Sequence, residues 1–128
     1  MIIAGMGLAA LAAALHVYIF VLESIVWTGR TARRTFGMSR DAAQATKPLA
    51  FNQGFYNLFL SVEIVLGIAF FLAGQETIGL TLLFVGTGST VAAGLVLLLS
   101  DRRKARAALT QLTPGARAIV ALAIGVAA

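Results

Sequence analysis

Four long apolar stretches dominate the sequence, and each carries very few charged residues. They run over residues 2–27, 49–73, 77–100 and 112–128. About 20 residues of α-helix, rising roughly 1.5 Å each, cross the ~30 Å hydrocarbon layer of a bilayer. Hydrophobic residues make up 59% of the chain, well above the share in soluble domains. We therefore predict an all-α integral membrane protein, a four-helix bundle that forms a single membrane domain over residues 1–128.

The distribution of basic residues predicts how these helices are oriented. All ten Lys and Arg residues lie after the first and third stretches or at the start of the fourth. Because basic connections remain on the cytoplasmic side, both should face the cytoplasm, with the N-terminus, the Gly74 to Glu76 turn and the C-terminus outside. Anionic lipid headgroups, rather than nucleic acid, are then the expected partner of the net charge of +5.

The first connection and the third apolar stretch carry local signals of their own. Ser39 is a plausible N-cap for a short surface helix over residues 40–46, and Pro48 suits the first turn of the second span. Gly86, Thr90 and Gly94 recur every four residues, so they should let helix backbones approach closely. Such stripes fit packing within the bundle, a homo-oligomer or a membrane protein partner.

Polar residues occur inside the first two spans, where a lipid-facing position would be costly. In the first span, His16, Glu23 and Trp27 share one helical face. The polar groups of both spans should therefore meet in one layer of the cytoplasmic half. The residues of the second span that belong to this layer are Asn52, Gln53, Tyr56 and Asn57.

These groups suggest a chemical site, because ionisable residues within a span are functional candidates. We expect His16, Glu23 and Tyr56 to be catalytic. The substrate-binding residues should be Trp27, Asn52, Gln53 and Asn57. The alternative for the amides is helix association through hydrogen bonds, and the alternative for Trp27 is an interfacial aromatic belt.

His16 is the only histidine, and three roles remain open for it. It could form structural hydrogen bonds, act as a general base oriented by Glu23, or provide a single axial ligand to a haem. The cofactor is otherwise unknown. A zinc site is not expected, because one carboxylate and amides do not complete a tetrahedral ligand set. Glu63 lies nearer the outer half, where it should be protonated, hydrogen-bonded to Thr87, Ser89 or Thr90, or in a subunit contact.

The sequence also resembles a known family through three groups of residues. They are His16-x-Tyr18-Ile19 with Leu22-Glu23 and Trp27, then Asn52-Gln53-Gly54-x-Tyr56-Asn57, then Gln111-x-x-Pro114. This pattern is similar to a family of small bacterial four-span membrane proteins that is catalogued as a domain of unknown function. The resemblance implies the same four-helix fold and marks the matched polar residues as the family signature. We expect the chain to be a multi-pass protein of the cell inner (plasma) membrane.

Several functions are compatible with these features. The first is a small membrane enzyme with isomerase- or epimerase-type acid/base chemistry on a lipophilic substrate. The alternatives are an accessory subunit of a larger membrane complex, and an oligomeric pathway for a small solute or protons. A bound lipophile would favour the enzyme, and a fixed protein partner would favour the subunit.

Overall fold

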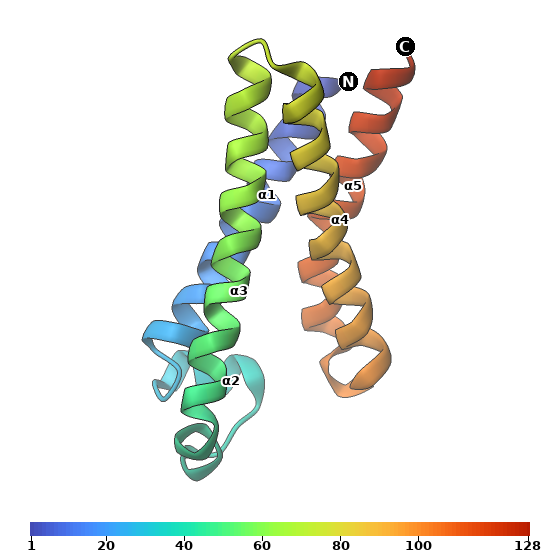
Figure 1. Ribbon diagram of the computed structural model, residues 1–128. Coiled ribbons are helices and arrows are strands. Elements are labelled where there is room, and N and C mark those ends of the chain that lie inside the picture. Colours follow the sequence, from blue (N-terminus) through green and yellow to red (C-terminus); the bar gives the residue numbers. More distant parts are fainter.

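The computed structural model describes all 128 residues, and its secondary structure is entirely helical (Figure 1). In chain order, the elements are α1 (Ile2–Phe20), the π-helix η1 (Val21–Ile25), α2 (Arg30–Phe36), α3 (Arg40–Leu72), α4 (Glu76–Ser100), the 3-10 helix η2 (Arg102–Lys104) and α5 (Ala105–Ala127).

Four segments are long and apolar enough to cross a membrane. They cover Ile2–Ile25, Arg40–Leu72, Glu76–Ser100 and Arg102–Ala127. Each segment contains all or nearly all of one predicted apolar stretch. The prediction of an all-α, multi-pass membrane protein is therefore confirmed. The third span begins within one residue of its predicted start and ends at its predicted end.

The chain ends and the connections divide between the two ends of the bundle. Both termini lie at the same end as the turn between α3 and α4 (Figure 1). That turn contains Gly74, whose φ of 82° is in the left-handed region that glycine adopts without strain. Both basic connections lie at the opposite end, although they are apart from each other (Figure 1). This arrangement follows from four spans that alternate in direction.

The helices pack through small residues. A Cβ atom on Gly86 of α4 would lie 2.7 Å from Ile64 Cγ1 of α3, and one on Gly5 of α1 would lie 2.7 Å from Leu122 Cγ of α5. Gly94 approaches α5 equally closely, at 2.6 Å from Leu112 Cβ. The predicted close packing at Gly86 and Gly94 is therefore confirmed, and it operates within the chain.

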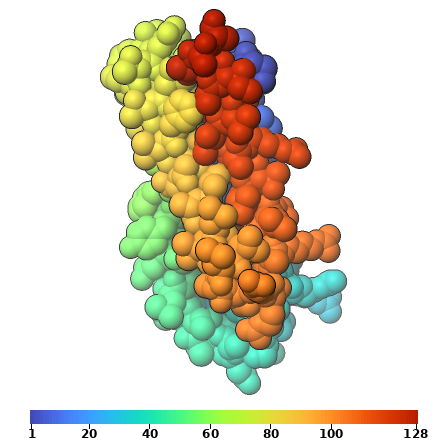
Figure 2. Space-filling view, turned by 90° about the vertical axis from the view of Figure 1, so that its right-hand side faces the viewer, coloured from blue at the N-terminus to red at the C-terminus, as the bar shows by residue number.

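The four helices do not stay together along their whole length. All four helices lie close together near the termini. Toward the opposite end, which contains the two basic connections, α1 stays beside α3 and α4 beside α5, and these two pairs diverge (Figure 1). The side view shows that the end formed by α2 and the start of α3 extends beyond the connection between α4 and α5 (Figure 2). α3 therefore continues past the point where α4 can cover it.

The expected short helix over residues 40–46 and the second span are one continuous helix, so the predicted break at Pro48 is wrong. Ser39 does cap the helix, because its hydroxyl accepts a hydrogen bond from Ala42 N at 3.1 Å. Proline inside a helix leaves the carbonyl four residues earlier without its N–H partner. That carbonyl belongs to Gln44, an exposed residue, so solvent can take the place of the missing donor.

The last span also starts earlier than predicted. α5 begins at Ala105 instead of 112 and runs through Pro114. The carbonyl that Pro114 leaves unpaired belongs to Thr110, which is exposed in the same way as Gln44. The seven-residue helix α2 was not predicted at all, because its sequence is too basic to show an apolar periodicity.

Candidate functional site

The candidate site begins with a distortion at the end of the first span. Residues 21–25 form a π-helix, closed by a hydrogen bond from Val26 N to Val21 O at 3.0 Å. Glu23 is at the centre of this segment. Single π-helical turns within α-helices are frequent at functional sites, because they re-aim side chains that regular geometry would place elsewhere. This distortion sets the direction in which Glu23 points.

Gly54 allows α3 to pass directly over this distorted turn. A Cβ atom at position 54 would collide with Ser24 Oγ and lie 3.1 Å from Glu23 Cβ. Ser24 uses the close approach, because its hydroxyl donates to Phe51 O at 2.8 Å. The crossing therefore fixes Glu23 against α3 with little room for adjustment.

Asn57 holds the carboxylate of Glu23. Its Nδ2 donates to Glu23 Oε2 at 2.8 Å and to the backbone oxygen of Gln53 at 3.2 Å. These two bonds use both hydrogens of the amide group. Asn57 is 6% exposed, whereas Glu23 is half-buried, so Asn57 is well placed to position Glu23 and the carboxylate stays partly accessible.

His16 lies deeper in the bundle and is completely buried, with 0% of its surface exposed. Its Nδ1 is 2.8 Å from Ala12 O, a carbonyl that can only accept, so Nδ1 must carry the proton. Nε2 is then an acceptor in the neutral ring, and no protein group lies within hydrogen-bonding distance of it. Ala12, and not Glu23, orients the imidazole ring, so of the three roles left open for His16 the general base oriented by Glu23 does not match this geometry.

Ser61 joins α1 to α3 between these two levels. Its hydroxyl donates to Ala13 O at 2.9 Å and lies 3.1 Å from Asn57 O on its own helix. Sequence reasoning missed Ser61 and Gly54. Their signal was the spacing of Gly54, Asn57, Ser61 and Ile64 along one face of α3, which are four buried residues at helical intervals.

The remaining polar residues of α3 lie outside the buried layer. Asn52, Gln53 and Tyr56 are exposed, and Tyr56 is 64% exposed. Helix periodicity gives the reason, because Asn52 and Tyr56 lie away from the face of α3 that contains the buried residues Gly54 and Asn57. The prediction that the four polar residues of the second span share one buried layer is therefore correct for Asn57 alone.

Trp27 follows the π-helix and is partly buried. Its Nε1 donates to Thr46 Oγ1 at 3.1 Å, and its ring lies 5.1 Å from that of Phe36 in α2. The indole therefore ties together the end of the first span, α2 and the start of α3. This is the level at which an interfacial aromatic residue belongs.

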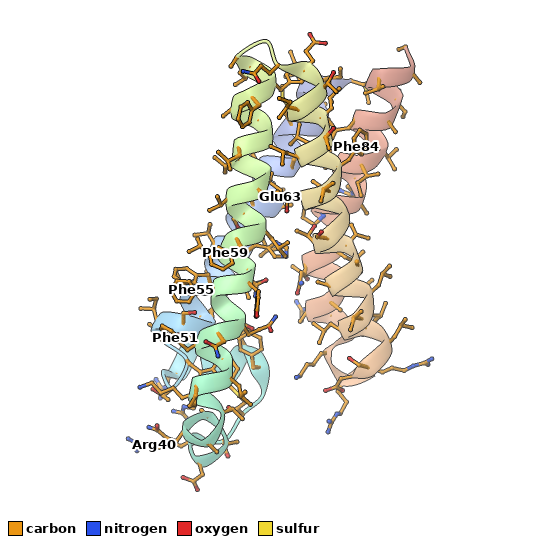
Figure 3. The ribbon with its side chains drawn as sticks, in the orientation of Figure 1. Arg40, Phe51, Phe55, Phe59, Glu63 and Phe84 are labelled. Atoms are coloured by element: carbon orange, nitrogen blue, oxygen red, sulfur yellow. The ribbon has the colours of Figure 1, made fainter.

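Glu63 stands apart from the site, on the side of α3 that faces α4 (Figure 3). Its Cγ is 3.5 Å from the point where a Cβ of Gly86 would be. The predicted hydrogen bonds from Thr87 and Thr90 are wrong, because their hydroxyls donate to Leu83 O and Thr87 O of their own helix. Ser and Thr hydroxyls in helices commonly donate a hydrogen bond to a carbonyl three or four residues earlier in the same helix.

The residues around His16 do not fit a haem. A haem ligand must present its nitrogen to the open face of a large planar ring, whereas the side chain of His16 is covered on all sides. A macrocycle would have to separate α1 from its neighbours. Nε2 is left as a buried acceptor without a protein partner, which a proton or a small polar group could satisfy.

Comparison with known proteins places the chain in a family. The family model described as a protein of unknown function (DUF1304) matches residues 10–123. The chain belongs to this family. The resemblance noted in the sequence is thus confirmed, and the matched range includes every residue from His16 to Asn57 described above. No curated protein and no solved structure matches the chain.

Proposed function

We propose that this DUF1304 protein is a small membrane enzyme that moves a proton on a lipophilic substrate, with Glu23 as the acid/base group. The hydrogen bond between Glu23 and Asn57, set on a π-helical turn at the end of the first span, is the observation that carries the proposal. An acid/base carboxylate needs a fixed direction and partial access, and Glu23 has both. A purely structural carboxylate would need neither the π-turn nor an open side.

The substrate would contain a polar function at the end of an apolar body. Glu23 lies near the end of the first span that leads into the basic connection, and the exposed residues Asn52, Gln53 and Tyr56 lie within about one and a half turns of its partner Asn57. These three side chains can donate hydrogen bonds to a carbonyl oxygen, whereas the amide hydrogens of Asn57 are already used. Because Asn52, Gln53 and Tyr56 are exposed on α3, a molecule that arrives from the bilayer can reach them.

The simplest reaction is an isomerisation or epimerisation next to a carbonyl. The Glu23 carboxylate takes a proton from the carbon beside the carbonyl, and the electron pair moves into an enolate whose oxygen the polar donors stabilise. Return of the proton to another face or position completes the reaction, so no co-reactant is consumed. His16 would serve as a second proton site deeper in the bundle, through the free Nε2.

Exchange of hydrogen with solvent tests this reaction even while the substrate is unidentified. The purified protein is incubated in D₂O with a total bacterial lipid extract, and the extract is analysed by mass spectrometry. We expect one lipophile to gain deuterium with the wild type and to lose that gain with Glu23→Gln. Glu63→Gln is the matched control, because it removes a carboxylate from the same helix bundle outside the site.

Two results would overturn the proposal. If no lipophile gains deuterium with the wild type, or if Glu23→Gln exchanges as fast as the wild type, Glu23 is not the acid/base group. A stoichiometric protein that copurifies in mild detergent, without a bound lipophile, would instead favour the accessory-subunit function.

A further inference from the structure

A second feature of the chain is independent of Glu23 and lies on α2. Arg30, Arg33, Arg34 and Gly37 occur at intervals of three and four residues, so they share one face of this short helix. The opposite face is closed by the buried Ala32. The arginine face, together with Met38, lines a pocket of about 360 Å³, which we call the arginine pocket.

The backbone shapes one wall of the arginine pocket. Gly37 ends α2 with a φ of 65°, and Met38 N then returns to hydrogen-bond Arg33 O at 2.9 Å. Only a residue without a side chain adopts this left-handed turn easily. Arg33 is held as well, because its Nε donates to Thr28 O at 3.2 Å. Its remaining guanidinium hydrogens are left for a ligand.

No arginine of the arginine pocket forms a salt bridge. The salt bridges in the chain join Asp101 to Arg103 at 3.1 Å and to Lys104 at 3.8 Å, and both lie in the other basic connection. Arg30, Arg33 and Arg34 therefore bring three unpaired positive charges to one small concavity. Guanidinium groups suit phosphate oxygens, because their N–H groups can bind two oxygens at once.

The position of α2 further limits the class of ligand that the arginine pocket can bind. The helix follows the first span after a four-residue connection, and Phe36 packs on Trp27 at the end of that span. The arginine pocket is thus held at the level where lipid phosphates lie. We propose that the arginine pocket is a binding site for a phosphate-bearing anion, supplied either by an anionic phospholipid headgroup or by a soluble phosphate compound.

Trp27 provides a direct reporter, since it is the only tryptophan and contacts the helix that carries the pocket. The full-length protein in neutral detergent is titrated with dihexanoyl phosphatidylglycerol, dihexanoyl phosphatidylcholine and inorganic phosphate, and Trp27 fluorescence is recorded. Native mass spectrometry of the same samples counts retained anions. We expect saturable binding of phosphatidylglycerol or inorganic phosphate and none of the zwitterionic lipid.

Paired variants distinguish a built site from general surface charge. Arg30→Gln/Arg34→Gln removes two charges from the pocket and spares Arg33, whereas Arg102→Gln/Arg106→Gln removes two charges from the other connection and spares the pair at Asp101. The first variant should bind the anion on the order of tenfold more weakly. The second should change affinity by less than about twofold, because its charges lie outside the pocket.

The outcomes are decisive in both directions. Binding of phosphatidylglycerol but not inorganic phosphate identifies a lipid headgroup as the ligand, and comparable binding of inorganic phosphate identifies a soluble phosphate compound. Equal weakening in both double variants would show that only the diffuse charge matters and would overturn the proposal. Absence of any retained anion in the mass spectra would overturn it too.

Discussion

The side chains of Glu23 and Asn57 meet at 2.8 Å although 34 residues separate them in the sequence. Glu23 reaches this position from a π-helical turn, and Asn57 from the buried face of a helix that crosses the turn at Gly54. The bond therefore depends on a local distortion and on a helix crossing at the same time. A change in the turn or in the crossing should shift the position of the Glu23 carboxylate.

A double-mutant cycle should reveal coupling between Glu23 and Asn57. Glu23→Ala and Asn57→Ala each remove one partner of the hydrogen bond, and the double variant removes both. We expect a coupling free energy of about 1 kcal/mol, in line with polar pairs between membrane helices. Reversible unfolding in mixed detergent and SDS micelles measures it. Strictly additive effects would mean that the two groups do not interact in the folded protein.

Gly54→Ala should destabilise the protein, because the added methyl group collides with Ser24 Oγ and lies 3.0 Å from Ser24 N. Overpacking of this kind typically costs about 1–3 kcal/mol. The matched control is Gly88→Ala, since a Cβ at position 88 meets nothing within 4 Å. Gly88→Ala should leave stability unchanged or raise it by up to ~1 kcal/mol, because alanine favours the helix. Similar losses in the two variants would contradict the close crossing.

The sequence predicts the class of this fold well, because its main determinant is local. Length and apolarity define the four spans independently of any tertiary contact, and the third span agrees within one residue with the observed helix. The breaks expected at Pro48 and before Pro114 do not occur. Proline removes one backbone hydrogen bond from a helix, and here both freed carbonyls belong to exposed residues, where solvent can replace the lost donor.

The site was harder to predict, because it depends on how two helices cross. The sequence indicated that Glu23 and the polar residues of α3 lie at similar depths, and Glu23 does meet Asn57. It did not indicate the π-helical turn, which has no clear sequence signature, or the use of Gly54 as the crossing point. Asn52 and Tyr56 are exposed because they lie away from the buried face of α3, and the sequence did not indicate which face of this helix packs against α1.

Trp27→Phe should loosen the connection between the first span and α2. Phenylalanine keeps the aromatic contact with Phe36 but loses the hydrogen bond to Thr46 Oγ1. A single bond of this type contributes about 0.5–1.5 kcal/mol. Hydrogen exchange should show faster opening of residues 30–36 in Trp27→Phe and also in Thr46→Val. Unchanged protection in both variants would show that the bond does not anchor α2.

Asp101 should titrate at low pH in the connection between α4 and α5. A hydrogen bond from Arg103, together with the charges of Arg103 and Lys104, holds the pKa of Asp101 below its ordinary value. Because the pKa of Asp101 is lower in the folded than in the unfolded state, its ionised carboxylate stabilises the fold. This contribution to stability is complete above the unfolded-state pKa and disappears as the pH falls through the folded-state pKa. Carboxyl NMR shifts of Asp101 measure the midpoint. Arg103→Ala should raise it, and an unchanged midpoint would contradict the pairing.

Replacement of His16 separates a structural role from a chemical one. His16 is fully buried, bonds only Ala12 O through its ring, and leaves Nε2 without a protein partner. His16→Leu fills a similar volume and removes the unpaired polar atom, so the free energy of unfolding should change by less than about 1.5 kcal/mol. If His16 serves as a proton site, the same variant should lose solvent deuterium exchange while it remains folded. A large loss of stability with unchanged exchange per folded molecule would instead assign His16 to structure alone.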